Sequence, residues 1–75
     1  MSKPTRITNS IRALRFARGE MTQAELAQRI GVTRQTIIAI EQGRYSPSLE
    51  VAFQIARVFK VPLDNVFQYP EGESR

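Results

Sequence analysis

Apolar residues recur at helical spacing along most of the chain, and polar caps and glycines divide them into short segments. In the first segment, Ile11 and Leu14 lie three residues apart on one face, after Asn9 or Ser10 as a cap. Gly19 is expected to end this helix because glycine readily adopts a positive φ. The pattern therefore predicts a first helix between these two boundaries.

A capping box opens the second segment. Thr22 and Glu25 have the spacing at which each side chain satisfies a free backbone donor of the other residue. The helix that they open is about two turns long and ends at Gly31. Its buried residues are expected to be Leu26, Ala27 and Ile30. A third helix begins after a turn of three residues, 31–33, so the pattern predicts two helices at a short spacing.

The third helix is capped by Thr33 and ends before Gly43. At about 100° per residue, one side carries Arg34, Gln35, Ile38, Ala39 and Gln42. The other side carries Thr36, Ile37 and Ile40, and the two isoleucines form the expected buried stripe. Arginine pairs with guanine, glutamine pairs with adenine and an apolar group contacts the thymine methyl, so the first side suits a major groove. A plain amphipathic helix also fits, but the capped helix and short turn in front favour DNA reading.

The last part of the chain predicts two more helices. Ser48 caps a fourth helix, and Val61 with Pro62 breaks it. Five residues are at core spacing along this helix: Leu49, Ala52, Ile55, Ala56 and Phe59. A short fifth helix covers residues 63–67, and a polar tail follows it. Because every strong segment is helical, we expect an all-α fold. Whether the termini form a small strand pair is left open by the sequence.

Length and composition restrict the possible functions. A chain of 75 residues has room for one domain with a modest core. Without cysteine or histidine it lacks disulfides, thiolate nucleophiles, Cys/His zinc sites and imidazole catalysis, and its carboxylates are scattered. We therefore expect no enzyme, no catalytic residue, no metal, no cofactor and no small-molecule ligand. No segment resembles a membrane span or a leader, so we expect a cytoplasmic protein without a membrane partner.

The net charge of +4 is distributed unevenly. Residues 1–46 contain eight basic and three acidic side chains, whereas residues 47–75 have a net charge of −1. A basic half joined to a near-neutral half is typical of a polyanion-binding face opposite an assembly face. A solvated surface rich in arginine fits the charge alone equally well.

Residues 21–43 resemble the phage repressor and Cro family of helix-turn-helix regulators, also called the XRE family. The shared motif is T-Q-x-x-L-A-x-x-x-G-V-x-x-x-x-I-x-x-I-E-x-G, and the resemblance extends over residues 9–67. It implies a five-helix, lambda-repressor-like domain with the helix-turn-helix at about 22–42, an N-terminal arm at 1–8 and a C-terminal tail at 68–75. The end of the chain looks like that of small single-domain dimeric repressors such as the cytolysin repressor, whose termini form a short antiparallel ribbon.

The resemblance implies a role for individual residues. Those that would contact base edges are Arg34, Gln35 and Ile38. Those that would contact the DNA backbone are Gln23, Thr33, Gln42, Gly43 and Arg44. Arg15 and Glu41 match an ion pair between the first and third helices. The homodimer would use apolar residues near the end of the chain, opposite the basic face: Leu63, Val66, Phe67 and Tyr69. The expected partners are thus double-stranded operator DNA and a second copy of the chain.

Some residues depart from the pattern. Glu20 makes the link between the first two helices one residue longer than usual, and Ile38 takes an outward position that is often polar. Ile38 can lie against a thymine methyl or be an exposed apolar residue without consequence. Phe16 and Phe53 fall outside the simple core pattern, and packing at the core edge is favoured over an interface.

The leading hypothesis is a sequence-specific repressor that binds a palindromic operator. An antitoxin would use the same helix-turn-helix and add a toxin-binding surface, for which the residues after Phe67 offer little room. An adaptor that binds a protein in place of DNA would have no need for Arg34, Gln35 and Arg44 on an exposed face.

Overall fold

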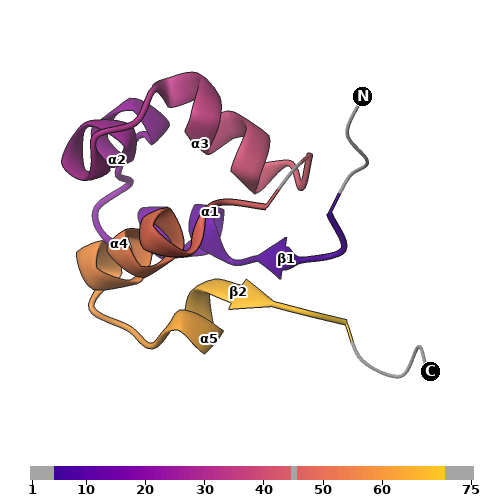
Figure 1. Cartoon of the computed structure of the whole chain (residues 1–75). Coiled ribbons are helices and arrows are strands. Elements are labelled where there is room, and N and C mark those ends of the chain that lie inside the picture. The colour runs from indigo at the N-terminus through magenta and orange to yellow at the C-terminus, as the bar shows by residue number, and fades with distance from the viewer. Residues whose placement is uncertain (1–4, 45, 71–75) are drawn as a thin grey trace.

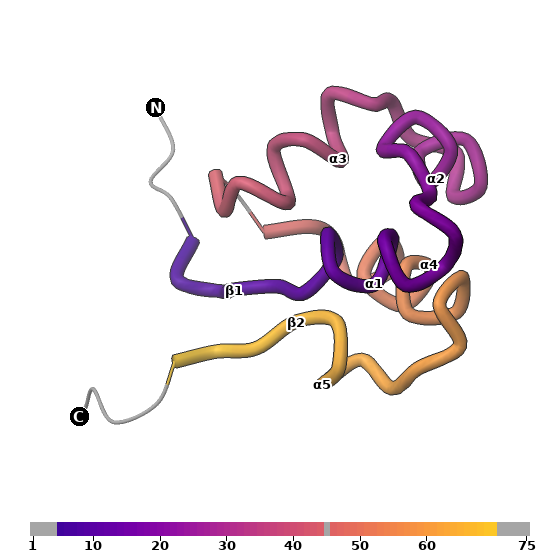
Figure 2. Tube along the Cα trace, turned by 180° about the vertical axis from the view of Figure 1, so that it is seen from behind, coloured from indigo at the N-terminus to yellow at the C-terminus, as the bar shows by residue number. Residues whose placement is uncertain are grey.

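Five helices and two short strands make up the part of the chain that the computed structural model describes, residues 5–44 and 46–70 (Figure 1). In chain order they are β1 (Thr8–Asn9), α1 (Ile11–Ala17), α2 (Gln23–Ile30), α3 (Arg34–Glu41), α4 (Leu49–Phe59), α5 (Leu63–Val66) and β2 (Phe67–Gln68). In both views α2 and α3 lie at the top of the molecule and α1 and α4 overlap in the middle (Figures 1 and 2). The helix α5 and the strand β2 lie at the bottom. The structure confirms the five-helix fold with an antiparallel ribbon.

Side-chain caps start three of the helices where the sequence predicts them. Thr22, Thr33 and Ser48 each accept a hydrogen bond from the backbone amide three residues ahead, at 3.0, 3.2 and 3.2 Å. The capping box of α2 is complete because Glu25 accepts from the Thr22 amide. These bonds satisfy donors that a helix cannot pair internally.

The first helix begins differently. The Ser10 side chain makes no capping hydrogen bond, and the Asn9 side-chain oxygen accepts from the Ile11 amide at 3.1 Å. Of the two alternatives that the sequence left open, Asn9 supplies the cap.

Left-handed residues end several helices. Gly31 adopts φ +77° at the end of α2 and allows the chain to turn sharply into α3. Two non-glycine residues also lie in this region: Glu20, with φ +61°, and Lys60, with φ +57°. Glu20 is the extra residue of the link between α1 and α2, and Lys60 ends α4 one residue before the expected break.

The core lies between the helices. Its fully buried large side chains are Ile11, Leu26, Ile37, Ile40, Ile55 and Val66. Leu49, which the sequence places in the core, is 67% exposed, and Val51 packs against the core instead. The expectation for Leu49 was wrong: this residue begins the first turn of α4, and the core of the described chain does not cover it there.

The ribbon joins residues from opposite ends of the described chain. Thr8 pairs with Gln68 and Asn9 with Phe67, and the Ser10 amide donates to the Val66 carbonyl at 2.9 Å. Phe67 is therefore in a strand rather than in the fifth helix, which ends one residue earlier than the sequence predicts. None of the helices in residues 5–44 and 46–70 is long and apolar enough to cross a membrane.

Candidate DNA interface

The helices α2 and α3 form a helix-turn-helix whose two partners pack through apolar side chains. Leu26, Ala27 and Ile30 of α2 lie in one core cluster with Ile37 and Ile40 of α3. Figure 1 shows α3 along the upper edge of the molecule, where one of its faces is uncovered by the rest of the described chain. The pair therefore holds α3 with its apolar stripe inward and the opposite stripe toward solvent.

The predicted base-contacting residues lie on this outer stripe. Arg34 and Gln35 are exposed in the first turn of α3, and Ile38 is partly exposed one turn further on. The N-terminal turn of the second helix is the part that enters the major groove in helix-turn-helix complexes. The structure thus brings the three side chains to one accessible face, as a DNA-reading helix requires.

The predicted backbone-contacting residues fall into two groups. Gln42, Gly43 and Arg44 follow each other at the C-terminal end of α3, where Gln42 and Arg44 are exposed and Gly43 is partly exposed. Gln23 and Thr33 instead start α2 and α3. The Thr33 hydroxyl caps its helix and shares a hydrogen bond of 3.1 Å with the Thr36 hydroxyl. Capping thus accounts for Thr33 in the structure, and its phosphate contact stays a prediction.

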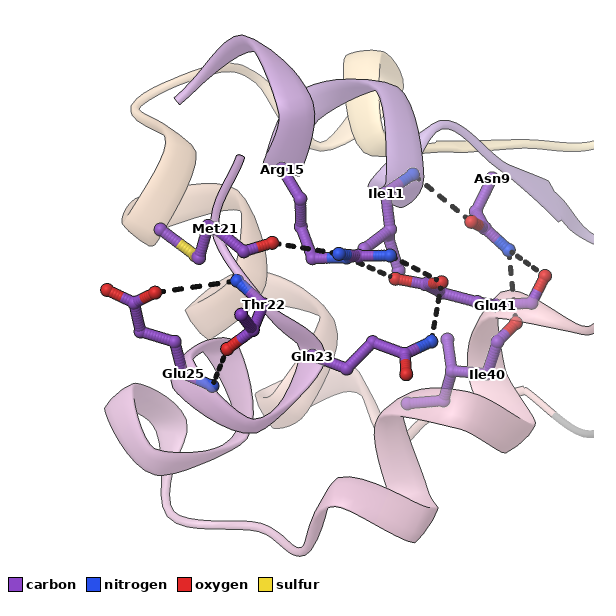
Figure 3. A network of polar contacts seen from close by, with 9 residues as sticks. All are labelled: Asn9, Ile11, Arg15, Met21, Thr22, Gln23, Glu25, Ile40 and Glu41. Carbon is purple, nitrogen blue, oxygen red and sulfur yellow. Dashed lines mark hydrogen bonds and ion pairs between the residues drawn. The ribbon is translucent and has the colours of Figure 1, made fainter. Parts of the chain in front are cut away.

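Arg15 and Glu41 form the ion pair that the resemblance implies, and it is buried (Figure 3). The guanidinium donates to both carboxylate oxygens of Glu41, Nε at 2.7 Å and Nη2 at 3.1 Å. Its Nη1 donates to the Met21 carbonyl at 2.8 Å. The two side chains are 8% and 10% exposed. One arginine therefore ties α1, the link before α2 and the end of α3 together.

Gln23 joins the same network, which the sequence did not predict. Its side-chain nitrogen donates to Glu41 Oε1 at 3.1 Å (Figure 3). A carboxamide has two N–H donors, so one remains for another acceptor. Glu41 thus fixes the position of a residue that we expect to contact a phosphate.

Asn9 makes a contact with the end of α3 that the sequence did not predict. Its amide nitrogen donates to the carbonyls of Ile40 and Glu41, at 3.0 and 3.5 Å (Figure 3). The Ile40 carbonyl also accepts from the Gly43 amide at 3.0 Å, whereas the Glu41 carbonyl belongs to the last residue of α3 and has no partner inside the helix. One side chain therefore caps the start of α1 and the end of α3 together. Only its capping of α1 is visible in the local sequence, because the second partner is 31 residues away.

A polar hollow opens where α1, the start of α2 and the end of α3 meet. Its lining residues are Asn9, Arg12, Arg15, Phe16, Gln23, Glu41 and Gln42. Two of them, Gln23 and Gln42, are predicted backbone contacts. The hollow thus lies beside the C-terminal half of the outer face of α3.

The four residues predicted for the dimer interface differ in accessibility. Tyr69 is 63% exposed, and Leu63 and Phe67 are partly buried against the core. Val66 is 0% exposed within the single chain, between the other two. The assignment of Val66 to an interface was wrong: this inward residue of α5 belongs to the core and offers no surface to a second copy.

Comparisons with known proteins agree with this geometry. The helix-turn-helix family model matches residues 11–66. An HTH-type transcriptional regulator of Methanothermobacter thermautotrophicus is 73% identical over 56 residues, which are 73% of this chain and 81% of the relative. An HTH-type transcriptional regulator of Methanocaldococcus jannaschii is 53% identical over 53 residues, which are 71% of this chain and 80% of the relative.

Two more distant similarities concern function and fold. The cryptic phage CTXphi transcriptional repressor RstR of Vibrio cholerae is 39% identical over 56 residues, 75% of this chain and 50% of the repressor. The crystal structure of a Bacteroides fragilis protein described as DNA-binding superposes with a TM-score of 0.71 at 22% identity, covering 83% of this chain and 98% of that one. At this identity the second similarity shows the fold alone. The chain belongs to the XRE-type helix-turn-helix family of transcriptional regulators, which are DNA-binding proteins and not enzymes.

Proposed function

We propose that this regulator is a repressor that binds a palindromic operator as a homodimer, acting on genomic DNA in the cytoplasm. The observation that carries the proposal is the outer face of α3, where Arg34 and Gln35 are exposed and Ile38 follows one turn later. These side chains match the acceptors of guanine and adenine and the methyl group of thymine. The similarity to a phage repressor supports repression as the direction of control.

A second copy is needed because one α3 reaches only a few base pairs. Paired subunits of such proteins bind half-sites about 34 Å apart, one turn of B-DNA, and the operator repeats the twofold symmetry of the dimer. We assign the subunit contact to Leu63, Phe67 and Tyr69. We include the exposed Leu49 and Phe53 in this surface, because they lie on α4, the helix that packs against α5. These residues lie in the half of the chain that lacks an excess of basic charge.

Selection of bound sequences from random duplexes tests the proposal directly. The expected result is enrichment of an inverted repeat whose half-site centres are about 10 base pairs apart. Enrichment of a single half-site would contradict the homodimer and leave sequence-specific binding intact. Failure to enrich any sequence at low salt would favour the adaptor function, in which the same face of α3 binds a protein.

A further inference from the structure

Phe16 is an exposed aromatic residue beside the proposed DNA-binding face. Its side chain lies on α1 and is 52% exposed, so the core does not account for it. The guanidinium carbon of Arg12 is 5.4 Å from the centre of its ring, and that of Arg15 is 5.8 Å away. A guanidinium within about 6 Å of an aromatic ring is attracted to the ring face. The ring therefore has a specific partner in Arg12, one helical turn earlier.

The two arginines differ in the charge that they present to solvent. Arg15 is buried and its charge is balanced by Glu41. Arg12 is exposed, and no carboxylate in residues 5–44 and 46–70 forms an ion pair with it. The guanidinium held over Phe16 thus remains available to an anion.

The surroundings of Arg12 indicate which anion fits. Arg12 lines the polar hollow together with Gln23 and Gln42. The glutamine side chains supply further N–H donors, and Gln23 is the first residue of α2, where helix amides favour an anion. Because Arg15 balances Glu41, Arg12 is the lining side chain whose charge has no partner within the described chain. A tetrahedral oxyanion with one negative charge matches this set of donors.

We propose that Arg12, positioned by Phe16, binds a phosphate of the DNA backbone next to the hollow between α1, α2 and α3. This inference rests on the proposed DNA-binding function and adds a contact from α1 to those of the helix-turn-helix. Arg12 touches the phosphate, whereas Phe16 is a positioning residue that keeps the guanidinium from spreading over other conformations. The contact is independent of base sequence, so it sets affinity and register and leaves base preference unchanged.

Substitution of Arg12 is the first test. Arg12→Gln removes one phosphate contact per subunit, or two per dimer. The slope of log K against log salt should then fall by about 1.8, and affinity at 0.1 M salt should fall about tenfold or more, equally on operator and random duplexes. Arg29→Gln is the matched control, because Arg29 is exposed in the last turn of α2 and is assigned neither to the DNA-binding face nor to the dimer surface. Equal effects of the two substitutions would overturn the proposal.

Substitution of Phe16 tests the positioning role. Phe16→Leu keeps an apolar side chain and removes the ring, so operator and random duplexes should lose affinity by the same factor, smaller than for Arg12→Gln. In the background of Arg12→Gln, Phe16→Leu should have no further effect on DNA binding. Gln28→Leu is the control, since Gln28 is exposed on α2 and is assigned neither to the DNA-binding face nor to the dimer surface. A full additional loss in the double variant would show that Phe16 acts without Arg12.

Neutral methylphosphonate linkages identify the phosphate itself. Placed one at a time along the operator, they should weaken binding of the unsubstituted protein at one symmetric position that has no effect with Arg12→Gln. If every linkage weakens both proteins equally, Arg12 contacts no single phosphate and the proposal fails. If the unsubstituted protein binds no duplex at all, the proposed function fails first, and the assignment of Arg12 fails with it. Thermal unfolding of each variant confirms that the exposed substitutions leave the fold intact.

Discussion

Arg34 and Arg44 stand at opposite ends of α3 and are expected to differ in what they contact. Arg34 is exposed in the first turn, where a planar guanidinium can bond both acceptors of a guanine. We expect Arg34→Ala to cost about 1–3 kcal/mol of binding free energy on the operator and much less on random DNA. Titrations on both duplexes measure the difference. Equal losses would make Arg34 a phosphate contact and leave specificity to Gln35, Ile38 and DNA shape.

Arg44 is exposed after Gly43, beyond the end of α3, and we expect it to contact the DNA backbone. Arg44→Ala should weaken operator and random DNA by similar factors and lower the salt slope by about 0.9 per contact, or about 1.8 per dimer. The same titrations, repeated at several salt concentrations, check this result. A loss confined to the operator would instead place Arg44 at a base edge.

Lys60 offers a test of backbone conformation that is separate from DNA binding. Its positive φ costs a non-glycine residue about 1–2 kcal/mol, and glycine avoids this cost at some loss of chain entropy. We expect Lys60→Gly to raise the free energy of unfolding by up to about 1 kcal/mol. Lys60→Ala is the control, because alanine keeps the strain; a similar gain from both would point to the lysine charge as the cause.

At the scale of elements, the end of α3 is held from outside the helix-turn-helix. Arg15 bonds both carboxylate oxygens of Glu41, and both side chains are buried. Removing one partner of such a pair leaves a buried charge unpaired and costs about 3–5 kcal/mol. In a domain of this size, we expect Glu41→Gln to lower the melting temperature by roughly 10 °C or more.

Glu50→Gln is the control for this comparison, because Glu50 is exposed in the first turn of α4. An exposed ion pair or a charge at a helix end contributes about 1 kcal/mol at most to the free energy of unfolding. If Glu41→Gln and Glu50→Gln lowered the melting temperature equally, the network around Glu41 would contribute nothing beyond surface charge.

The helices could be predicted because their boundaries depend on neighbouring residues. The caps at Thr22, Thr33 and Ser48 and the turn at Gly31 are local features, and the structure has each of them where the sequence indicates. Periodicity also separated the inward Ile37 and Ile40 from the outer face of α3.

Contacts between distant segments could not be predicted in the same way. The Asn9 bonds to the end of α3 span 31 and 32 residues, the Gln23 bond to Glu41 spans 18, and no local pattern encodes them. Leu49 and Val66 were assigned to the wrong surroundings because apolar character alone does not show which helix covers a residue. Tertiary packing decides that question.

For the whole molecule, the placement of exposed apolar residues predicts the assembly state. Leu49 and Phe53 lie one turn apart on the outer side of α4 and are 67% and 50% exposed. We expect the double substitution Leu49→Glu and Phe53→Glu to convert the dimer into a folded monomer that binds one half-site weakly. Sedimentation equilibrium at micromolar concentration measures the change, with Arg29→Glu, on the exposed surface of α2, as the control. A monomeric unsubstituted protein would contradict the dimer itself.

The ribbon between β1 and β2 determines at which stage of its synthesis the chain becomes able to bind DNA tightly. Asn9 belongs to β1, and the same residue holds the last carbonyls of α3. Its strand partner, Phe67, is synthesised 58 residues later. Closing so long a loop is slow compared with forming local helices. A growing chain that has completed α2 and α3 therefore still lacks the strand that fixes Asn9. We expect tight binding to begin only after residues 67–68 have left the ribosome, which keeps unfinished chains from occupying the operator.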